Sequence, residues 1–156
     1  MKYFVIIFFF ILLNCKEEKK SFKFEDITRI VYISDKIVYD ITGNYYILDK
    51  RFKEPGKHSL MMSKNDLFLV KKKIIDENIY KLDDSLRFVK SCESICLSEI
   101  IIQYKSGRKQ HFRFDNSNYK NNFNNKSYRT ITNLEESIMN IIVNNVREPE
   151  PLHTYM

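Results

Sequence analysis

Apolar side chains recur with a period of two in three successive stretches of the chain, at residues 27–33, 37–41 and 45–48. In the first stretch both alternating sets carry β-branched or aromatic residues. Successive side chains of a strand point to opposite faces of a sheet, so this period is typical of strands. A turn at residues 34–36 and a Gly43-Asn44 hairpin signal separate the stretches. The pattern predicts an antiparallel meander of three strands.

The period then changes from that of a strand to that of a helix. After a loop and a short strand expected at residues 59–62, Ser63 and Asp66 have the spacing of a capping box. Apolar residues follow at helical spacing, at Leu67, Val70, Ile74 and Ile75. The sequence therefore predicts an amphipathic helix that ends near Asn78, with lysines 71–73 on its solvated side.

A second hairpin is predicted farther along the chain. Residues 98–104 and 109–114 alternate on either side of a turn that contains Gly107. One face of the first strand carries Ile100, Ile102 and Tyr104. On the second strand Phe112 and Phe114 point away from His111 and Arg113. We expect His111 to be a solvated residue on the polar face, because most histidines in such positions are neither ligands nor bases.

The last predicted element is a helix near the end of the chain. Residues 116–127 are rich in asparagine and are expected to form a loop. Thr132 and Glu135 have the spacing of a second capping box. A helical stripe accompanies them, made of Leu134, Ile138, Ile141 and Ile142. This helix should pack on the sheet.

Together these elements predict a single α+β domain over residues 26–146. We expect an antiparallel sheet of about five strands, rich in hairpins, with the two amphipathic helices packed on one face. Residues 147–156 contain Pro149 and Pro151 and are expected to form a mobile tail.

The first residues of the chain have the pattern of a secretory leader. Met1 and Lys2 are followed by an unbroken apolar run at residues 3–13. This run is about half of the roughly 20 residues that a membrane-spanning helix needs. It also has no polar face that would suit a packed helix. We therefore expect a signal peptide over residues 1–14 rather than a permanent membrane span.

The end of the leader resembles the lipobox of bacterial lipoproteins. Leu12 stands three residues before Cys15, although Asn14 departs from the small residue usual before the cysteine. The resemblance implies cleavage before Cys15 and acylation of its thiol, with residues 15–25 as a charged tether. Two or three acyl chains would hold a domain stably on a membrane. The implied location is the cell envelope, on an outer membrane.

The three residues after Cys15 are Lys16, Glu17 and Glu18. They are similar to the lysine-acid-acid surface-export signal of lipoproteins in some Gram-negative lineages. The alternative is a solvated tether that its charges keep extended. The domain faces the outside of the cell in the first case and the periplasm in the second.

Cys92 and Cys96 remain as an even pair once Cys15 is assigned to lipidation. In an oxidising compartment, cysteines this close can reach the distance that a disulfide needs. We expect a short-loop disulfide between them. A competing interpretation is a metal or thiol-redox site, because C-x-x-x-C resembles the copper-binding element of copper-delivery proteins of the thioredoxin fold. Those proteins also use a distant histidine, for which His111 and His153 are available.

Charge and composition add little to the functional picture. The formal net charge is +6, but the cations are spread and form no basic stripe with stacking aromatics, so we expect no nucleic-acid partner. The chain has no alanine or tryptophan and is rich in lysine, isoleucine and asparagine, which is the footprint of an AT-rich coding sequence. We also find no phosphate loop, nucleophile elbow or histidine pair, and we expect no catalytic residue, metal site or cofactor.

The order of elements resembles small Gram-negative lipoprotein domains of unknown function, in which an aromatic-leucine turn follows a helix. Tyr80 and Leu82 match that turn. This resemblance implies no catalytic residue. We therefore expect a lipid-anchored, non-enzymatic envelope protein with the membrane as one partner and an envelope protein as another. The alternatives are a copper or thiol-redox protein that uses Cys92 and Cys96, and an inhibitor or immunity-type lipoprotein.

Overall fold

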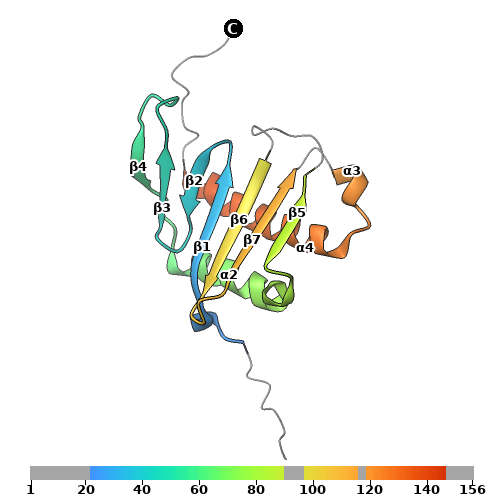
Figure 1. Ribbon diagram of the computed structural model, residues 1–156. Coiled ribbons are helices and arrows are strands. Elements are labelled where there is room, and N and C mark those ends of the chain that lie inside the picture. The colour runs from blue at the N-terminus through green and yellow to red at the C-terminus, as the bar shows by residue number, and fades with distance from the viewer. Residues whose placement is uncertain (1–21, 90–96, 116–118, 147–156) are drawn as a thin grey trace, which may run out of the picture.

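The computed structural model describes residues 22–89, 97–115 and 119–146 of the chain. Within these ranges a seven-stranded sheet carries helices on one side (Figure 1). The strands are β1 (Ile27–Ser34), β2 (Ile37–Asp40), β3 (Tyr45–Leu48), β4 (Gly56–Ser59), β5 (Ser85–Phe88), β6 (Leu97–Tyr104) and β7 (Lys109–Asp115). The helices are α2 (Lys64–Asp76), α3 (Tyr119–Asn122) and α4 (Lys126–Asn145), with short 3-10 turns η1 (Phe24–Asp26) and η2 (Ile79–Lys81).

The strands lie in the order β4-β3-β2-β1-β6-β7-β5. All neighbours are antiparallel except β5 and β7, which run parallel. The predicted α+β class is confirmed. The predicted sheet of about five antiparallel strands is wrong, because the described sheet has seven strands and is mixed.

The missed strand β5 has little local signal, since it is four residues long and pairs with a strand that follows it by more than twenty residues. Side-chain and backbone groups of β7 hold the segment that precedes β5. The Gln110 amide donates to the carbonyls of Ile79 and Leu82 at 3.1 and 2.7 Å, and the His111 backbone N–H donates to Asp84 at 2.8 Å. These contacts are long-range, so the parallel pairing could not be foreseen from the pattern alone.

The predicted meander is present and continues into β4, which lies three residues earlier than expected. The strand expected at residues 59–62 is wrong because the chain turns there. Met61 has a φ of 54°, in the left-handed region. The Asn44 side chain holds this turn, accepting a bond from the Met62 N–H at 2.9 Å and donating to the Met62 carbonyl at 3.2 Å.

The core lies between the sheet and the helices α2 and α4, which contact each other on the same face of the sheet. Alternate residues of the central strands point to this face and are completely buried, among them Ile30, Ile100, Ile102, Phe112 and Phe114. The helices contribute Val70 and Ile74 from α2, and Ile131, Leu134, Ile138 and Ile142 from α4. The buried face predicted for the 98–114 hairpin is therefore confirmed.

The capping box predicted for α2 is confirmed. The Ser63 hydroxyl accepts a bond from the Asp66 N–H at 3.1 Å, and the Asp66 carboxylate accepts one from the Ser63 N–H at 2.8 Å. The helix ends near the predicted position, and Asn78 follows it in the left-handed conformation. Lysines 71–73 were expected to be solvated, and this is wrong for Lys71. Its ammonium group donates to the Ile27 carbonyl at 2.8 Å and to the Phe24 carbonyl at 3.4 Å, and so fastens η1 and the start of β1 to α2.

The second predicted capping box is wrong. Helix α4 begins earlier, with Asn125 as the N-cap that accepts a bond from the Tyr128 N–H at 3.1 Å. Thr132 therefore lies inside the helix, where its hydroxyl donates to the Tyr128 carbonyl. The Glu135 side chain points into the core instead of toward a cap. The loop expected at residues 116–127 contains the short helix α3 and the first residues of α4.

Candidate functional site

The face of the sheet opposite α2 and α4 is covered by no helix of the described chain, and we call it the open face. Cross-strand neighbours place its side chains in rows. One row crosses all seven strands and contains Lys57, Ile47, Val38, Ile33, Glu99, Arg113 and Arg87. The next contains Ser59, Tyr45, Asp40, Val31, Ile101, His111 and Ser85. A third, over β1, β6 and β7, contains Arg29, Gln103 and Lys109.

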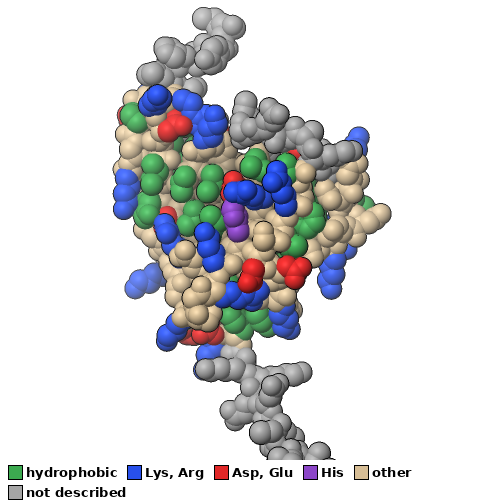
Figure 2. All heavy atoms as spheres, in the orientation of Figure 1, with side chains coloured by type: hydrophobic (Ala, Val, Ile, Leu, Met, Phe, Trp, Pro, Cys, Tyr) green, Lys and Arg blue, Asp and Glu red, His purple; other side chains and the backbone are tan. Residues whose placement is uncertain are grey.

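The centre of the open face is apolar. We define the apolar band as Val31, Ile33, Val38, Ile47 and Ile101, which lie on β1, β2, β3 and β6. Figure 2 shows hydrophobic side chains gathered on this part of the face. Ile47 is 41% exposed, Val31 is buried, and the other three side chains are half-buried. The solvated face of an antiparallel sheet is usually polar, so an aliphatic band there is unusual.

An ion pair between an exposed arginine and a buried carboxylate lies beside the apolar band. The Arg29 Nε donates to the Asp40 carboxylate at 2.8 Å, and Asp40 is only 4% exposed. The same carboxylate accepts a 2.7 Å bond from the Gly43 N–H. A side chain at Gly43 would meet the Tyr45 ring and Asp40 at 3.0 Å or less, so it would displace them from their present positions. Asp40 is therefore fixed in place by its own hairpin.

A second polar group lies on the other side of the band. Glu99 accepts bonds from the Nε2 of His111 at 2.5 Å and from the Nε of Arg113 at 3.2 Å. His111 was expected to be solvated, and this is wrong, because it is half-buried and contacts Glu99. The three side chains come from adjacent strands, β6 and β7, where Arg113 is directly opposite Glu99 and His111 is diagonal to it. A carboxylate held by two partners in this way is an ordered surface group.

The charge that the open face presents to solvent is positive. All of its five Lys and Arg side chains are exposed, whereas its three carboxylates are buried or half-buried. The cations are Arg29, Lys57, Arg87, Lys109 and Arg113, and the carboxylates are Asp40, Glu99 and Asp115. Lys57 lies over the Tyr45 ring, with its Nζ 3.7 Å from the ring centroid. The exposed cations lie around the apolar band.

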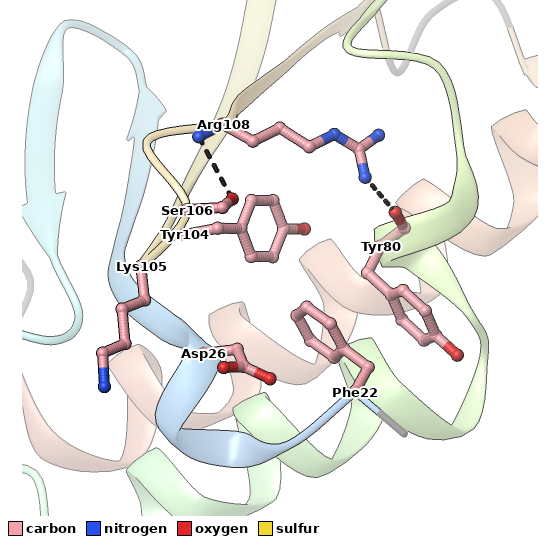
Figure 3. A pocket seen from close by; sticks show the side chains of 7 residues that line it. All are labelled: Phe22, Asp26, Tyr80, Tyr104, Lys105, Ser106 and Arg108. Atoms are coloured by element: carbon pink, nitrogen blue, oxygen red, sulfur yellow. Dashed lines mark hydrogen bonds between the residues drawn. The ribbon is translucent and has the colours of Figure 1, made fainter. Parts of the chain in front are cut away.

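A pocket of about 470 Å³ lies at the end of the sheet where η1, η2 and the β6–β7 turn meet (Figure 3). Three aromatic rings form part of its wall. The Phe22 ring stacks on Tyr80 with centroids 4.3 Å apart, and it meets Tyr104 edge-on at 5.5 Å. The Tyr104 hydroxyl is turned inward and donates to Gln110. Phe22 therefore joins the start of the described chain to the domain.

Arg108 lines the same pocket, but its guanidinium group is already bound. It donates to the Tyr80 carbonyl (Figure 3), and also to the Leu82 carbonyl at 2.8 Å and to the Asp84 carboxylate. Such a planar fork suits several fixed acceptors at once. Arg108 thus links the β6–β7 turn to η2 and to the residues just before β5.

The residues singled out by the sequence are not brought together by the structure. Cys15, Cys92 and Cys96 lie outside the described residues, as does His153. Within the described ranges, no three His, Cys, Asp or Glu side chains are grouped as a metal site would need. Among the residues that the structure describes, no helix has both the length and the apolar run needed to cross a membrane.

The sequence interpretation missed the open face, although one signal for it was present. Both alternating sets of residues 27–33 are apolar or aromatic, which is typical of a strand covered on both faces. In the structure Ile30 and Tyr32 point to the helices, and Val31 and Ile33 point to the open face. Comparisons of the chain with models of protein families, with curated proteins and with solved structures gave no match.

Proposed function

We propose that this protein is a lipid-anchored, non-enzymatic binding module of the cell envelope, and that it binds a protein partner through the open face of its sheet. The observation that carries the proposal is the apolar band. Contiguous aliphatic side chains on a solvated surface cost free energy, which association with a partner recovers. The rim of exposed cations around the band is the usual arrangement of an interface with an apolar centre and a polar edge.

The position of the proposed anchor supports this use of the face. Six residues separate Cys15 from Phe22, so an extended tether would span about 25 Å at roughly 3.5 Å per residue. Phe22 and η1 lie at the end of the sheet where β1 begins (Figures 1 and 3). If the domain is anchored at that end of the sheet, the open face does not lie flat on the membrane and stays accessible to a partner.

The binding role can be tested with a photoreactive amino acid in cells. A probe at Ile47 lies in the apolar band, and a probe at Leu69 lies on α2 with a similar exposed fraction, 47% against 41%. We expect a discrete protein adduct from position 47 and none from position 69. The adduct at 47 should disappear when Val38→Arg is added, with circular dichroism confirming that the domain still folds. Equal labelling from both positions, or none from 47, would overturn the proposal.

The anchor and the cysteine chemistry can be tested together by intact-mass measurement of protein extracted from membranes without reductant. We expect a chain that begins at Cys15, with a diacylglycerol and an acyl group added and about two daltons removed for a Cys92–Cys96 disulfide. An unlipidated chain would contradict the anchor. Free thiols at Cys92 and Cys96 would instead favour the copper or thiol-redox interpretation.

A further inference from the structure

We propose that the partner of the open face is an acidic protein surface, with an apolar centre and carboxylates around it. This inference rests on the proposed function, because it specifies the chemistry of the partner that the same face binds. It follows from the order of charges in the rows that cross the sheet.

The cations lie around the apolar band on three sides. In the first row Lys57 precedes the aliphatic residues on β4, and Arg113 and Arg87 follow them and Glu99 on β7 and β5. Strands in a sheet are about 4.8 Å apart, so the row extends for roughly 29 Å across its seven strands. Arg29 and Lys109 occupy the third row, next to the band. A partner that covers the band therefore meets cations along its margin.

The arginines of this margin are oriented for an external acceptor. Arg29 binds Asp40, and Arg113 binds Glu99, in each case through Nε. The terminal guanidinium nitrogens of Arg113 make no hydrogen bond within the described part of the chain, whereas the Arg29 side chain also hydrogen-bonds the Tyr45 side chain. The internal carboxylates thus hold both side chains in place, and the paired N–H groups of Arg113 remain available. A carboxylate is the group that this fork binds best, often with two parallel bonds.

Two other occupants fit the face less well. A second copy of this chain would bring one cationic margin against another, and like charges across an interface oppose association. A lipid surface would have to accept the ion pairs Arg29–Asp40 and Glu99–Arg113 in its apolar layer, which is costly. A protein can instead supply carboxylates at fixed positions around a complementary apolar centre.

A carbodiimide is the sharpest probe, because it joins a lysine amine directly to a carboxylate with which it is in contact. Envelope membranes that contain the full chain would be treated with it, and the cross-linked peptides identified by mass spectrometry. We expect Lys57 and Lys109 to be joined to Asp or Glu of one other protein, the same protein that the Ile47 photoprobe labels. Lys64, exposed at the start of α2, is the control and should give no such product.

Charge reversal supplies the quantitative test. The triple variant Lys57→Glu, Arg87→Glu and Lys109→Glu breaks no ion pair within the described residues, so the fold should persist. We expect the triple variant to lower the yield of the Ile47 photoadduct by about tenfold or more, because charges at the rim of an interface raise the rate at which the partners associate. The matched control is Lys64→Glu, Lys126→Glu and Arg129→Glu, which makes the same change in net charge on the helices. It should leave the yield unchanged.

The outcomes separate the two proposals. No photoadduct at Ile47 would overturn the binding role of the open face itself. A photoadduct that survives the triple charge reversal would leave that role standing and overturn the acidic partner. Carbodiimide products that join two isotopically distinct copies of this chain, or a photoadduct on lipid, would also overturn it.

Discussion

Tyr32 and Glu135 make a polar contact inside a largely apolar core. The Tyr32 hydroxyl donates to Glu135 Oε1 at 2.8 Å, and the two residues are 1% and 6% exposed. Burial, with the neighbouring carboxylate, raises the pKa of Tyr32 far above its usual range, so the residue stays a neutral donor. A buried charge needs such donors, because desolvation is costly when they are removed. This contact joins β1 to α4.

Replacing Tyr32 tests the contact directly. We expect Tyr32→Phe to lower the free energy of unfolding by about 1–3 kcal/mol, because a hydrogen bond to a buried carboxylate is lost. The matched control is Tyr80→Phe, whose hydroxyl makes only a long, exposed bond to Asn78 and whose loss should cost less than about 0.5 kcal/mol. Urea unfolding followed by circular dichroism measures both. Equal losses would show that Tyr32 contributes no special stabilisation.

Residue-scale prediction succeeded where the determining contacts are local. The faces of Ile100, Ile102 and Tyr104 followed from alternation alone. Lys71 was placed wrongly because its acceptor, the Ile27 carbonyl, is 44 residues away in the sequence. His111 was placed wrongly for a related reason, since its partner Glu99 is a diagonal neighbour on the adjacent strand. Spacing within one element does not report such contacts.

At the scale of elements, the two helix starts give opposite lessons. The Ser63 capping box could be predicted because it directly precedes the apolar stripe of α2. The same logic failed for α4, which begins at Lys126 after the N-cap Asn125, because its first turns contain fewer apolar residues. Thr132 has the capping-box spacing to Glu135, but it lies inside the helix and not at its start. This difference can be measured.

We expect Ser63→Ala to cost about 1 kcal/mol of stability, since the Asp66 N–H loses its acceptor at the helix start. Thr132→Ala should be neutral or slightly stabilising, because alanine has the higher helix propensity inside a helix. Denaturant midpoints of the two variants and the parent give the comparison. A larger loss from Thr132→Ala would contradict the helix start at residue 126.

The strand β5 depends on a contact between elements. Arg108, in the turn between β6 and β7, binds acceptors at Tyr80, Leu82 and Asp84, just before β5. We expect Arg108→Lys to lower stability by about 1–2 kcal/mol, because an ammonium group cannot reproduce the fork. Arg87→Lys, on β5 itself, is the control and should change little. Amide exchange should quicken in β5 before it does in β6. Unchanged exchange there would argue against the clamp.

At the scale of the whole molecule, a row of aromatic rings crosses the helix-side face of the sheet. Tyr32, Tyr39, Tyr46 and His58 lie on four adjacent strands, with successive ring centroids 5.9, 5.9 and 5.1 Å apart. Burial raises the pKa of Tyr39 to about 12, and it raises the pKa of Tyr104 beyond that. The core therefore holds several tyrosines that fold in the protonated form.

This burial predicts a loss of stability in alkali. Unfolded tyrosine ionises near pH 10, while Tyr39 in the folded state keeps its proton to about pH 12. Above pH 10 the unfolded state binds fewer protons, so stability falls as pH rises. Between pH 10 and 12 each such tyrosine contributes a slope of up to about 1.4 kcal/mol per pH unit.

Urea unfolding at several values between pH 9 and 11.5 measures this slope. Tyr39→Phe should make it shallower, whereas Tyr80→Phe, which removes a hydroxyl bonded to Asn78 at the exposed surface, should leave it as it is. If the Tyr39→Phe slope matched that of the parent protein, burial of Tyr39 would not be its cause.

The junction at Phe22 also determines how the domain would bear mechanical force. The chain enters through η1 directly into β1, which lies inside the sheet with β2 on one side and β6 on the other. Tension arriving from the N-terminal side would pull β1 along its own axis, across hydrogen bonds that lie perpendicular to it. Two ladders would then be sheared together instead of being unzipped one bond at a time. A domain tethered this way would resist stretching if a bound molecule pulled on it from the opposite side.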